Sequence, residues 1–309
     1  GNTGISNFYD AMFLFSGNLN VPENLRTFTE EIFVKNAGIK LDKYNFSHFP
    51  YFSTTKLNGE IVFNKGSDNA RSSATSFALT NCISTLIEVR GVRIGRSSFK
   101  RRTFITYLIA LSYLETIQLK SDQLRDEIKV AQDIKKDIYV RNKRSIYEDS
   151  LKVIDLDKNE LIKIPIKFRD ALKSKPDLVR SKPYAYLISS DKPKIVEKLR
   201  ILGLEVFKIS ERKKLEVEQY KICEFQKAGK KYEKVFMQKV STEINLTEIN
   251  IDAGTHIVFT NQKNSNLLFE VLEPEAPNSF VSWGVLKTKL NETLPIYRIP
   301  NYINLNYEK

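Results

Sequence analysis

The chain has 309 residues, and its 49 lysines and arginines exceed its 37 aspartates and glutamates to give a net charge of +12. Apolar residues make up 41% and charged residues 28%, a globular composition that excludes a wholly disordered or collagen-like chain. No window approaches the roughly 20 uninterrupted apolar residues of a membrane helix, so we expect no membrane span. At roughly 150 residues per domain, the length predicts two domains.

The positive charge raises the question of a nucleic-acid partner. Basic residues are spread along the chain and alternate with acidic ones, as in segments 129–144 and 209–221, which is typical of solvated surfaces. The sequence also carries no aromatic RNA-binding signature, zinc finger or basic leucine zipper. We therefore expect no nucleic-acid partner. The alternative, a basic nucleic-acid-binding protein, predicts nucleic-acid binding that falls steeply with added salt.

Cysteine and histidine are scarce. Cys82 and Cys223 are too few for a disulfide framework, so two buried free thiols are expected. The only histidines are His48 and His256, and the sequence contains no H-E-x-x-H, H-x-x-E or C-x-x-C motif. Because a catalytic zinc site usually takes three protein ligands, we assign no metal ligand within this chain.

In the first half of the chain, the spacing of apolar residues predicts helices around short strands. Apolar residues recur at helical spacing after Pro22, and Asn58-Gly59 is a turn signal before an apolar run. The small polar residues of segment 66–82 indicate either a pocket lining or a surface loop. The predicted order is loop at 1–22, helix at 23–44, loop and strand at 46–64, the polar segment at 66–82, and a long helix at 101–143.

A short apolar run between the polar segment and the long helix contains a charged pair. Leu86, Ile87 and Val89 predict a buried strand. Glu88 and Arg90 share one face of it, because side chains alternate along a strand. Burying an unpaired carboxylate is costly, so Glu88 needs either a partner, such as Arg90 or a lysine, or a chemical function. From the residues alone both readings stay open.

The second half begins with a rise in lysine and arginine and with Pro165 and Pro176, which predict a linker and a domain boundary near residue 145. Beyond it, a strand at 184–189, a helix at 191–203 that ends at a glycine, and a strand at 204–210 form a β-α-β unit. The remaining sequence alternates with period 2 and is predicted to be rich in strands.

Two separate blocks of sequence resemble zinc metallocarboxypeptidases, in particular the larger bacterial branch that has a C-terminal extension. The first block surrounds the catalytic glutamate of that family, and the second is similar to the C-terminal signature of that branch. The matching residues of the first block are Asn81, Leu86, Ile87, Glu88, Arg90, Gly91, Ile94, Gly95 and Arg96, and those of the second are Glu273, Pro274, Glu275, Ser279, Trp283, Pro295, Tyr297 and Arg298.

The resemblance implies an exopeptidase that removes C-terminal residues from peptides. Glu88 then acts as general base and acid, taking a proton from the attacking water and delivering it to the leaving amine. Arg71, Ser72 and Ser73 are expected to bind the substrate's C-terminal side chain or carboxylate, which a guanidinium grips in bidentate fashion. A surface position for Arg71 is the alternative. No tyrosine stands in residues 56–87, where known members place one that closes over the substrate.

The family's zinc ligands, an H-x-x-E pair and a later histidine, do not occur in the 87 residues before Glu88. The resemblance therefore implies zinc as cofactor of the complete enzyme, with ligands upstream of Gly1 and this chain inactive alone. His48 is expected in a loop or pocket, and Trp283 and Tyr297 as core aromatics. The competing hypothesis is a non-catalytic binding or scaffold module built on the same fold.

The expected fold class is α/β. Residues 1–145 would form the second half of a carboxypeptidase-like mixed-sheet α/β/α catalytic domain, and residues 146–309 a smaller, accessory α+β domain. A sheet without its upstream strands would present open edges. The resembling branch is mostly exported, so a periplasmic or secreted location is expected, although the first thirty residues show no signal peptide. The substrate would be a peptide, and the sequence does not predict an oligomeric state.

Overall fold

The computed structural model of the chain describes residues 5–132 and 137–309. Its fold class is mixed α/β, as expected, with a five-stranded, a seven-stranded and a three-stranded sheet in the described part of the chain. The described residues form two compact units, one of residues 5–132 with 142–175 and one of residues 137–141 with 176–309. None of the described helices is long and apolar enough to span a membrane.

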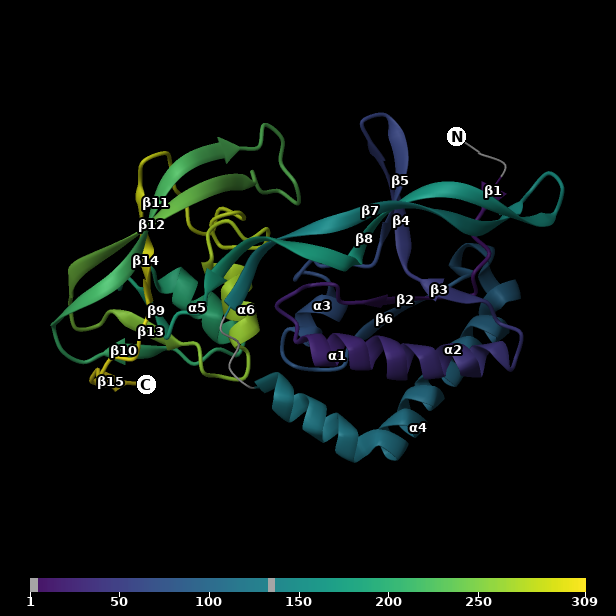
Figure 1. Ribbon diagram of the computed structural model, residues 1–309, viewed down its shortest axis with the longest axis horizontal. Coiled ribbons are helices and arrows are strands. Elements are labelled where there is room, and N and C mark those ends of the chain that lie inside the picture. The colour runs from purple at the N-terminus through teal and green to yellow at the C-terminus, as the bar shows by residue number, and fades with distance from the viewer. Residues whose placement is uncertain (1–4, 133–136) are drawn as a thin grey trace. The chain divides into compact units, whose positions relative to one another are not determined.

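The first unit contains the three-stranded sheet. Its central strand β2 (Ala11–Phe15) pairs in parallel with β3 (His48–Pro50) and antiparallel with β6 (Thr85–Val89). Helices lie against one face of this sheet (Figure 1), where their apolar residues pack on Ala11, Phe13 and Phe15. The segments that pack there are the π-helix η1 (Thr29–Val34), α2 (Lys35–Asp42) and α4 (Phe99–Gln132), and α1 (Glu23–Phe28) leads directly into η1.

The helix predicted at 23–44 is confirmed as the continuous run of α1, η1 and α2. The helix predicted at 101–143 is too long, because α4 ends at Gln132 and a strand begins at Asp137. The residues between them lie outside the described part. Ile138 and Val140 are both buried, and their two-residue spacing is the strand signal that the charge-rich surroundings concealed.

The five-stranded sheet packs an aromatic cluster around Phe63 and Phe168. The turn predicted at Asn58-Gly59 is confirmed, since both residues have positive φ, 51° and 86°, between two paired strands. The linker expected near residue 145 is instead part of a long strand. The strands are β1 (Ile5–Ser6), β4 (Phe52–Leu57), β5 (Glu60–Lys65), β7 (Asp137–Asp155) and β8 (Glu160–Ser181).

The second unit is built on the seven-stranded sheet, ordered β12-β11-β14-β9-β13-β10-β15. The predicted β-α-β unit is confirmed as β9 (Ala185–Ile188), α5 (Pro193–Ile201) and β10 (Phe207–Ile209). However, β13 (His256–Phe259) lies between β9 and β10 and is antiparallel to both. The other elements are β11 (Lys213–Lys227), β12 (Gln238–Ile251), α6 (Ser265–Leu272), β14 (Thr293–Ile299) and β15 (Tyr307–Glu308).

The two cysteines are free, as expected, but both are exposed rather than buried. Cys82 directly follows Asn81, which has a positive φ of 61°. Cys223 is the residue skipped where the pairing register of β11 with β12 shifts between Ile222 and Glu224, and its thiol donates to the carbonyl of Ser241 at 3.2 Å. A turn and a β-bulge thus keep both thiols out of the core.

Candidate functional site

Glu88 lies on β6, at the edge of the three-stranded sheet, and pairs with Met12 of β2. Because side chains of directly paired residues share a face, Glu88 points to the face opposite the helices, the one that Met12 also occupies. The side chain is exposed rather than buried, which corrects the expectation of a buried strand. No ion pair or hydrogen bond joins its carboxylate to any described residue, so neither form of the structural alternative, a pair with Arg90 or a pair with a lysine, is seen among them.

The backbone just after Glu88 is held by the main chain of Asp10 and by the side chain of Arg101, two contacts that sequence reasoning missed. The amide of Arg90 donates to the carbonyl of Asp10 at 2.9 Å, and the guanidinium of Arg101 donates to the carbonyl of Arg90 at 2.9 Å. Arg101 also pairs with the Asp10 carboxylate. No spacing in the sequence marks this contact, because Asp10 and Arg101 are 91 residues apart. The free carboxylate of Glu88 therefore stands on a fixed strand end.

The turn that follows requires a glycine. Gly91 has a φ of 122°, a conformation that other residues avoid. A Cβ atom at this position would lie 2.8 Å from Cβ of Ser98. The Ser98 hydroxyl donates to the Gly91 carbonyl at 2.5 Å. This close approach connects β6 to the 3₁₀ helix η2 (Val92–Ser98) and to the start of α4.

Arg71, Ser72 and Ser73 lie at the start of the short helix α3 (Ser73–Ala78), where Ser72 is the N-cap residue. Arg71 and Ser73 are exposed and Ser72 is half-buried. The Arg71 amide donates to the Asn69 side chain at 3.0 Å, which shapes the loop before α3. Among the described residues, Glu88 forms no hydrogen bond or ion pair with any of these three. Their grouping as a substrate site stays a prediction.

No zinc site is formed by the described residues, because they contain no cluster of three or more His, Cys, Asp or Glu side chains that could hold a metal ion. His48 is half-buried on β3, with Nε2 3.4 Å from the Asp42 carboxylate. Its ring packs so closely on α2 that a Cβ atom at Gly38 would lie 2.5 Å from Cε1 of His48. The expectation of a loop histidine is wrong, because His48 lies on strand β3 and packs against α2.

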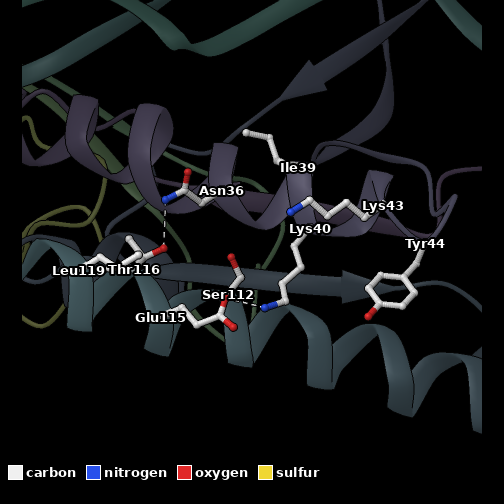
Figure 2. Close-up of a pocket in the computed structure, with 9 residues that line it drawn as sticks. All are labelled: Asn36, Ile39, Lys40, Lys43, Tyr44, Ser112, Glu115, Thr116 and Leu119. Atoms are coloured by element: carbon white, nitrogen blue, oxygen red, sulfur yellow. Dashed lines mark hydrogen bonds and ion pairs between the residues drawn. The ribbon is translucent and has the colours of Figure 1, made fainter.

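The first unit also has a cavity of about 420 Å³ between α2 and α4. Figure 2 shows Lys40 and Glu115 reaching toward each other across it, with 2.5 Å between Nζ and Oε2. Asn36 donates to the hydroxyl of Thr116 at 3.1 Å in the same groove. None of the predicted site residues lines this cavity. These polar contacts link the two helices.

The second block of the resemblance folds into a buried charged cluster in the second unit. Glu273 is fully buried, and its carboxylate accepts from Arg180 at 2.7 Å and lies 3.4 Å from Nε of Arg298. Glu275 accepts two hydrogen bonds from Arg180, at 2.8 Å each, and one from the Thr242 hydroxyl at 2.6 Å. The resemblance marked Glu273, Glu275 and Arg298, but Arg180 lay in the expected linker and was missed.

Burial and charge act in opposite directions on this cluster. Burial alone would raise the pKa of Glu275, but the hydrogen bonds and charge of Arg180 outweigh it and hold that pKa below its usual value. Burial raises the pKa of Tyr186 well above its usual value, and Glu273, which accepts from its hydroxyl at 2.5 Å, adds to that rise. Glu275 is therefore ionised at neutral pH and Tyr186 is a neutral donor.

The other marked residues of the second block serve packing. The Ser279 hydroxyl donates to the carbonyl of Pro274 at 2.8 Å and accepts from the Ser282 amide. Trp283 and Tyr297, expected in the core, are only half-buried. Trp283 donates to the carbonyl of Pro277 and contacts the Tyr232 ring, because it lies in a turn after α6 and not on an inward-facing strand position.

Comparison with known proteins shows that most of the chain is similar to carboxypeptidases. Carboxypeptidase 2 of Trichophyton rubrum is 28% identical over 295 residues, which cover 94% of this chain and 55% of that protein. The probable carboxypeptidase 2 of Arthroderma benhamiae is 29% identical over 273 residues, 85% of this chain and 51% of that protein. The chain thus spans about half the length of the curated relatives it matches.

No protein-family model matches the sequence, and no solved structure matches the fold significantly. The relatives support the carboxypeptidase part of the resemblance. Their names state neither a metal nor a bacterial branch, so both of these stay predictions.

Proposed function

We propose that this chain is part of a carboxypeptidase, an exopeptidase that removes C-terminal residues from peptides. The observation that carries the proposal is the similarity to carboxypeptidase 2 of Trichophyton rubrum along 94% of the chain. Such a reaction needs a group that takes a proton from the attacking water and returns it to the leaving amine. We assign this proton transfer to Glu88.

The surroundings of Glu88 support the assignment. A general base needs a carboxylate that is not already engaged, and Glu88 has no partner among the described residues. It also needs a fixed position, because small displacements of a catalytic group lower the rate strongly. The bonds of Asp10 and Arg101 to the Arg90 backbone supply that position.

Substrate binding is assigned to the loop before α3. We propose that the exposed Arg71 grips the C-terminal carboxylate of the peptide, as a guanidinium does in bidentate pairs. Ser72 and Ser73 would donate hydrogen bonds beside it. The peptide would then be held by its last residue, which is what separates an exopeptidase from an endopeptidase.

Zinc dependence belongs to the proposal, but the described residues do not fit a zinc site by themselves. We therefore propose that the metal ligands come from residues outside the described part, that the 309-residue chain alone is inactive, and that the complete enzyme is exported.

The test uses the natural protein at the full length in which it is produced. It is incubated with peptides of varied C-terminal residues, and released amino acids are identified by mass spectrometry. We expect release from the C-terminus only, loss of release with a chelator, and recovery with zinc. Glu88→Gln should lower kcat about 10²–10⁴-fold, the usual contribution of general acid–base catalysis.

Glu148→Gln is the matched control, because Glu148 is likewise an exposed strand glutamate of the first unit. It should leave kcat unchanged. A Glu88→Gln protein with normal kcat would remove Glu88 from the mechanism. Activity of the 309-residue chain alone, or activity that a chelator does not affect, would contradict the zinc assignment.

A non-catalytic binding module is the second candidate. The lack of a metal cluster among the described residues favours it. It predicts that the natural protein binds peptides but releases no amino acid at any zinc concentration, and that Glu88→Gln changes nothing but affinity.

A further inference from the structure

The second unit has a cavity of about 540 Å³ between α5 and the adjoining sheet. One face of α5 forms its wall through Val196, Arg200 and Ile201, which recur at helical spacing. Lys208 of β10 and His256 of β13 form the sheet side. These two residues are direct cross-strand partners, so their side chains stand next to each other on one face.

The cavity carries an excess of positive charge. Arg200 and Lys208 are both exposed, and Glu197 is the one carboxylate among the lining residues. Lys208 forms no ion pair with any described residue. Arg200 makes a single long bond, from Nη2 to the carbonyl of Val206 at 3.4 Å, which leaves most of its donors available.

His256 gives the cavity a polar floor with unused hydrogen-bonding capacity. The residue is only 8% exposed, and Nδ1 is enclosed without a hydrogen-bond partner. No described residue bonds to Nε2 either. Burial lowers the pKa of His256, and the charges of Lys208 and Arg200 lower it further, so the ring is neutral at pH 7. A buried polar side chain without partners is uncommon in folded proteins.

The lining selects a class of ligand. Two cations and one carboxylate leave a net charge of +1, which a singly charged carboxylate balances better than a doubly charged phosphate. Val196, Ile201 and Pro193 supply an apolar wall beside these charges. Guanidinium and ammonium groups give the strong, charge-assisted bonds that a carboxylate accepts.

We propose that this cavity is a binding site for a carboxylate attached to an apolar group, as in a short peptide or acylated amino acid with an apolar last residue. Arg200 and Lys208 bind the carboxylate, Nε2 of the neutral His256 ring donates a hydrogen bond to it, and Ile201 packs on the apolar group. The site lies wholly within the second unit, so a test of it does not depend on whether the proposed peptidase function is correct.

The experiment titrates the 309-residue chain with N-acetyl-leucine and follows the imidazole nitrogen signals by NMR. The chain has only two histidines, so His256 is observed directly and His48 is an internal control. We expect the His256 signals to shift and those of His48 to stay. The dissociation constant should be on the order of 1 mM, the usual value for a ligand of about twelve non-hydrogen atoms.

Two comparisons sharpen the result. N-acetyl-leucinamide, which lacks the charge, should bind at least about tenfold more weakly. Lys208→Gln and Arg200→Gln should each weaken N-acetyl-leucine about tenfold. Lys198→Gln, an exposed lysine of α5 that does not line the cavity, should change nothing.

The proposal is overturned if the acid and the amide bind equally, or if Lys198→Gln weakens binding as much as Lys208→Gln. Tighter binding of inorganic phosphate than of N-acetyl-leucine would overturn the assignment to a carboxylate. A shift of His48 instead of His256 would place the ligand elsewhere.

Discussion

The two blocks that resemble carboxypeptidases place their glutamates in opposite environments. Glu88 of the first unit is exposed at a sheet edge and has no partner among the described residues. Glu273 of the second unit is fully buried, and every oxygen of its carboxylate contacts an arginine or a tyrosine. The first carboxylate is available for chemistry, whereas the second is engaged in holding the fold together.

This contrast has an energetic meaning. A buried ion pair adds little net stability, but removing one partner leaves an uncompensated charge in a dry interior and destabilises strongly. An exposed, unpaired side chain can be changed with little effect on folding. Substitutions at Glu273 should therefore destabilise the protein strongly, whereas substitutions at Glu88 should leave its folding almost unchanged.

The largest effect is expected at Glu273. Glu273→Gln leaves Arg180 and Arg298 facing a neutral amide, and should lower the free energy of unfolding of the second unit by about 3–5 kcal/mol. Urea unfolding followed by tryptophan fluorescence measures this unit specifically, because Trp283 is the only tryptophan in the chain. A loss below about 1 kcal/mol would show that the cluster is not essential to folding.

A smaller loss is expected at Arg180. Its planar guanidinium bonds to both oxygens of Glu275 at 2.8 Å, and a lysine cannot reproduce this paired geometry. Arg180→Lys should cost about 1–3 kcal/mol, since charge is kept while hydrogen bonds are lost. Arg141→Lys, which changes a partly exposed pair with Asp177 in the same unit, is the control and should cost less than about 1 kcal/mol.

The lowered pKa of Glu275 makes the stability of the second unit depend on pH. Burial opposes the charge of Glu275, but Arg180 overcomes it and the folded pKa lies below the usual value. The unfolded state therefore binds more protons as the pH falls below about 4.5, so this contribution to stability is present above that pH and is lost on further acidification. Unfolding midpoints measured from pH 6 to 3 should fall less steeply in Glu275→Gln than in the parent. Equal slopes would contradict the assignment.

The smallest effect on stability is expected at Glu88. Glu88→Gln should change the free energy of unfolding by less than about 0.5 kcal/mol, as for other exposed positions. Hydrogen exchange of the β2 amides, which pair with β6, measures the stability of the first unit at this site. Faster exchange would mean that Glu88 has a structural partner after all, and would weaken its assignment to chemistry.

Local patterns were enough to predict several elements of the fold. The helix at 23–44, the turn at Asn58-Gly59 and the β-α-β unit each depend on residues close together in the sequence, and all three are confirmed. The helix predicted at 101–143 is too long, because the charged residues near its end show no apolar periodicity that would indicate where the helix stops. The strand signal there consists of only two apolar residues, Ile138 and Val140.

The candidate site was harder to predict because it depends on distant pairs. The sequence places Glu88 on a strand, but its exposure depends on β6 being an edge of the sheet. The contact of Arg180 with Glu273 joins residues 93 positions apart, and no spacing rule reaches that far. The resemblance identified Glu88, Glu273 and Glu275. Only the fold shows that Glu88 is exposed and that the other two are buried.

The position of β13 in the seven-stranded sheet has a consequence for how the protein is made. Strand β9 pairs on one side with β13 and on the other with β14, and both partners leave the ribosome long after it. The β-α-β segment therefore emerges with no strand to bond to, and it must wait until residue 259 has been synthesised before β9, β13 and β10 can join. Until then the apolar side chains of β9 have no partner strands around them, and unpaired apolar strands of this kind are prone to aggregation.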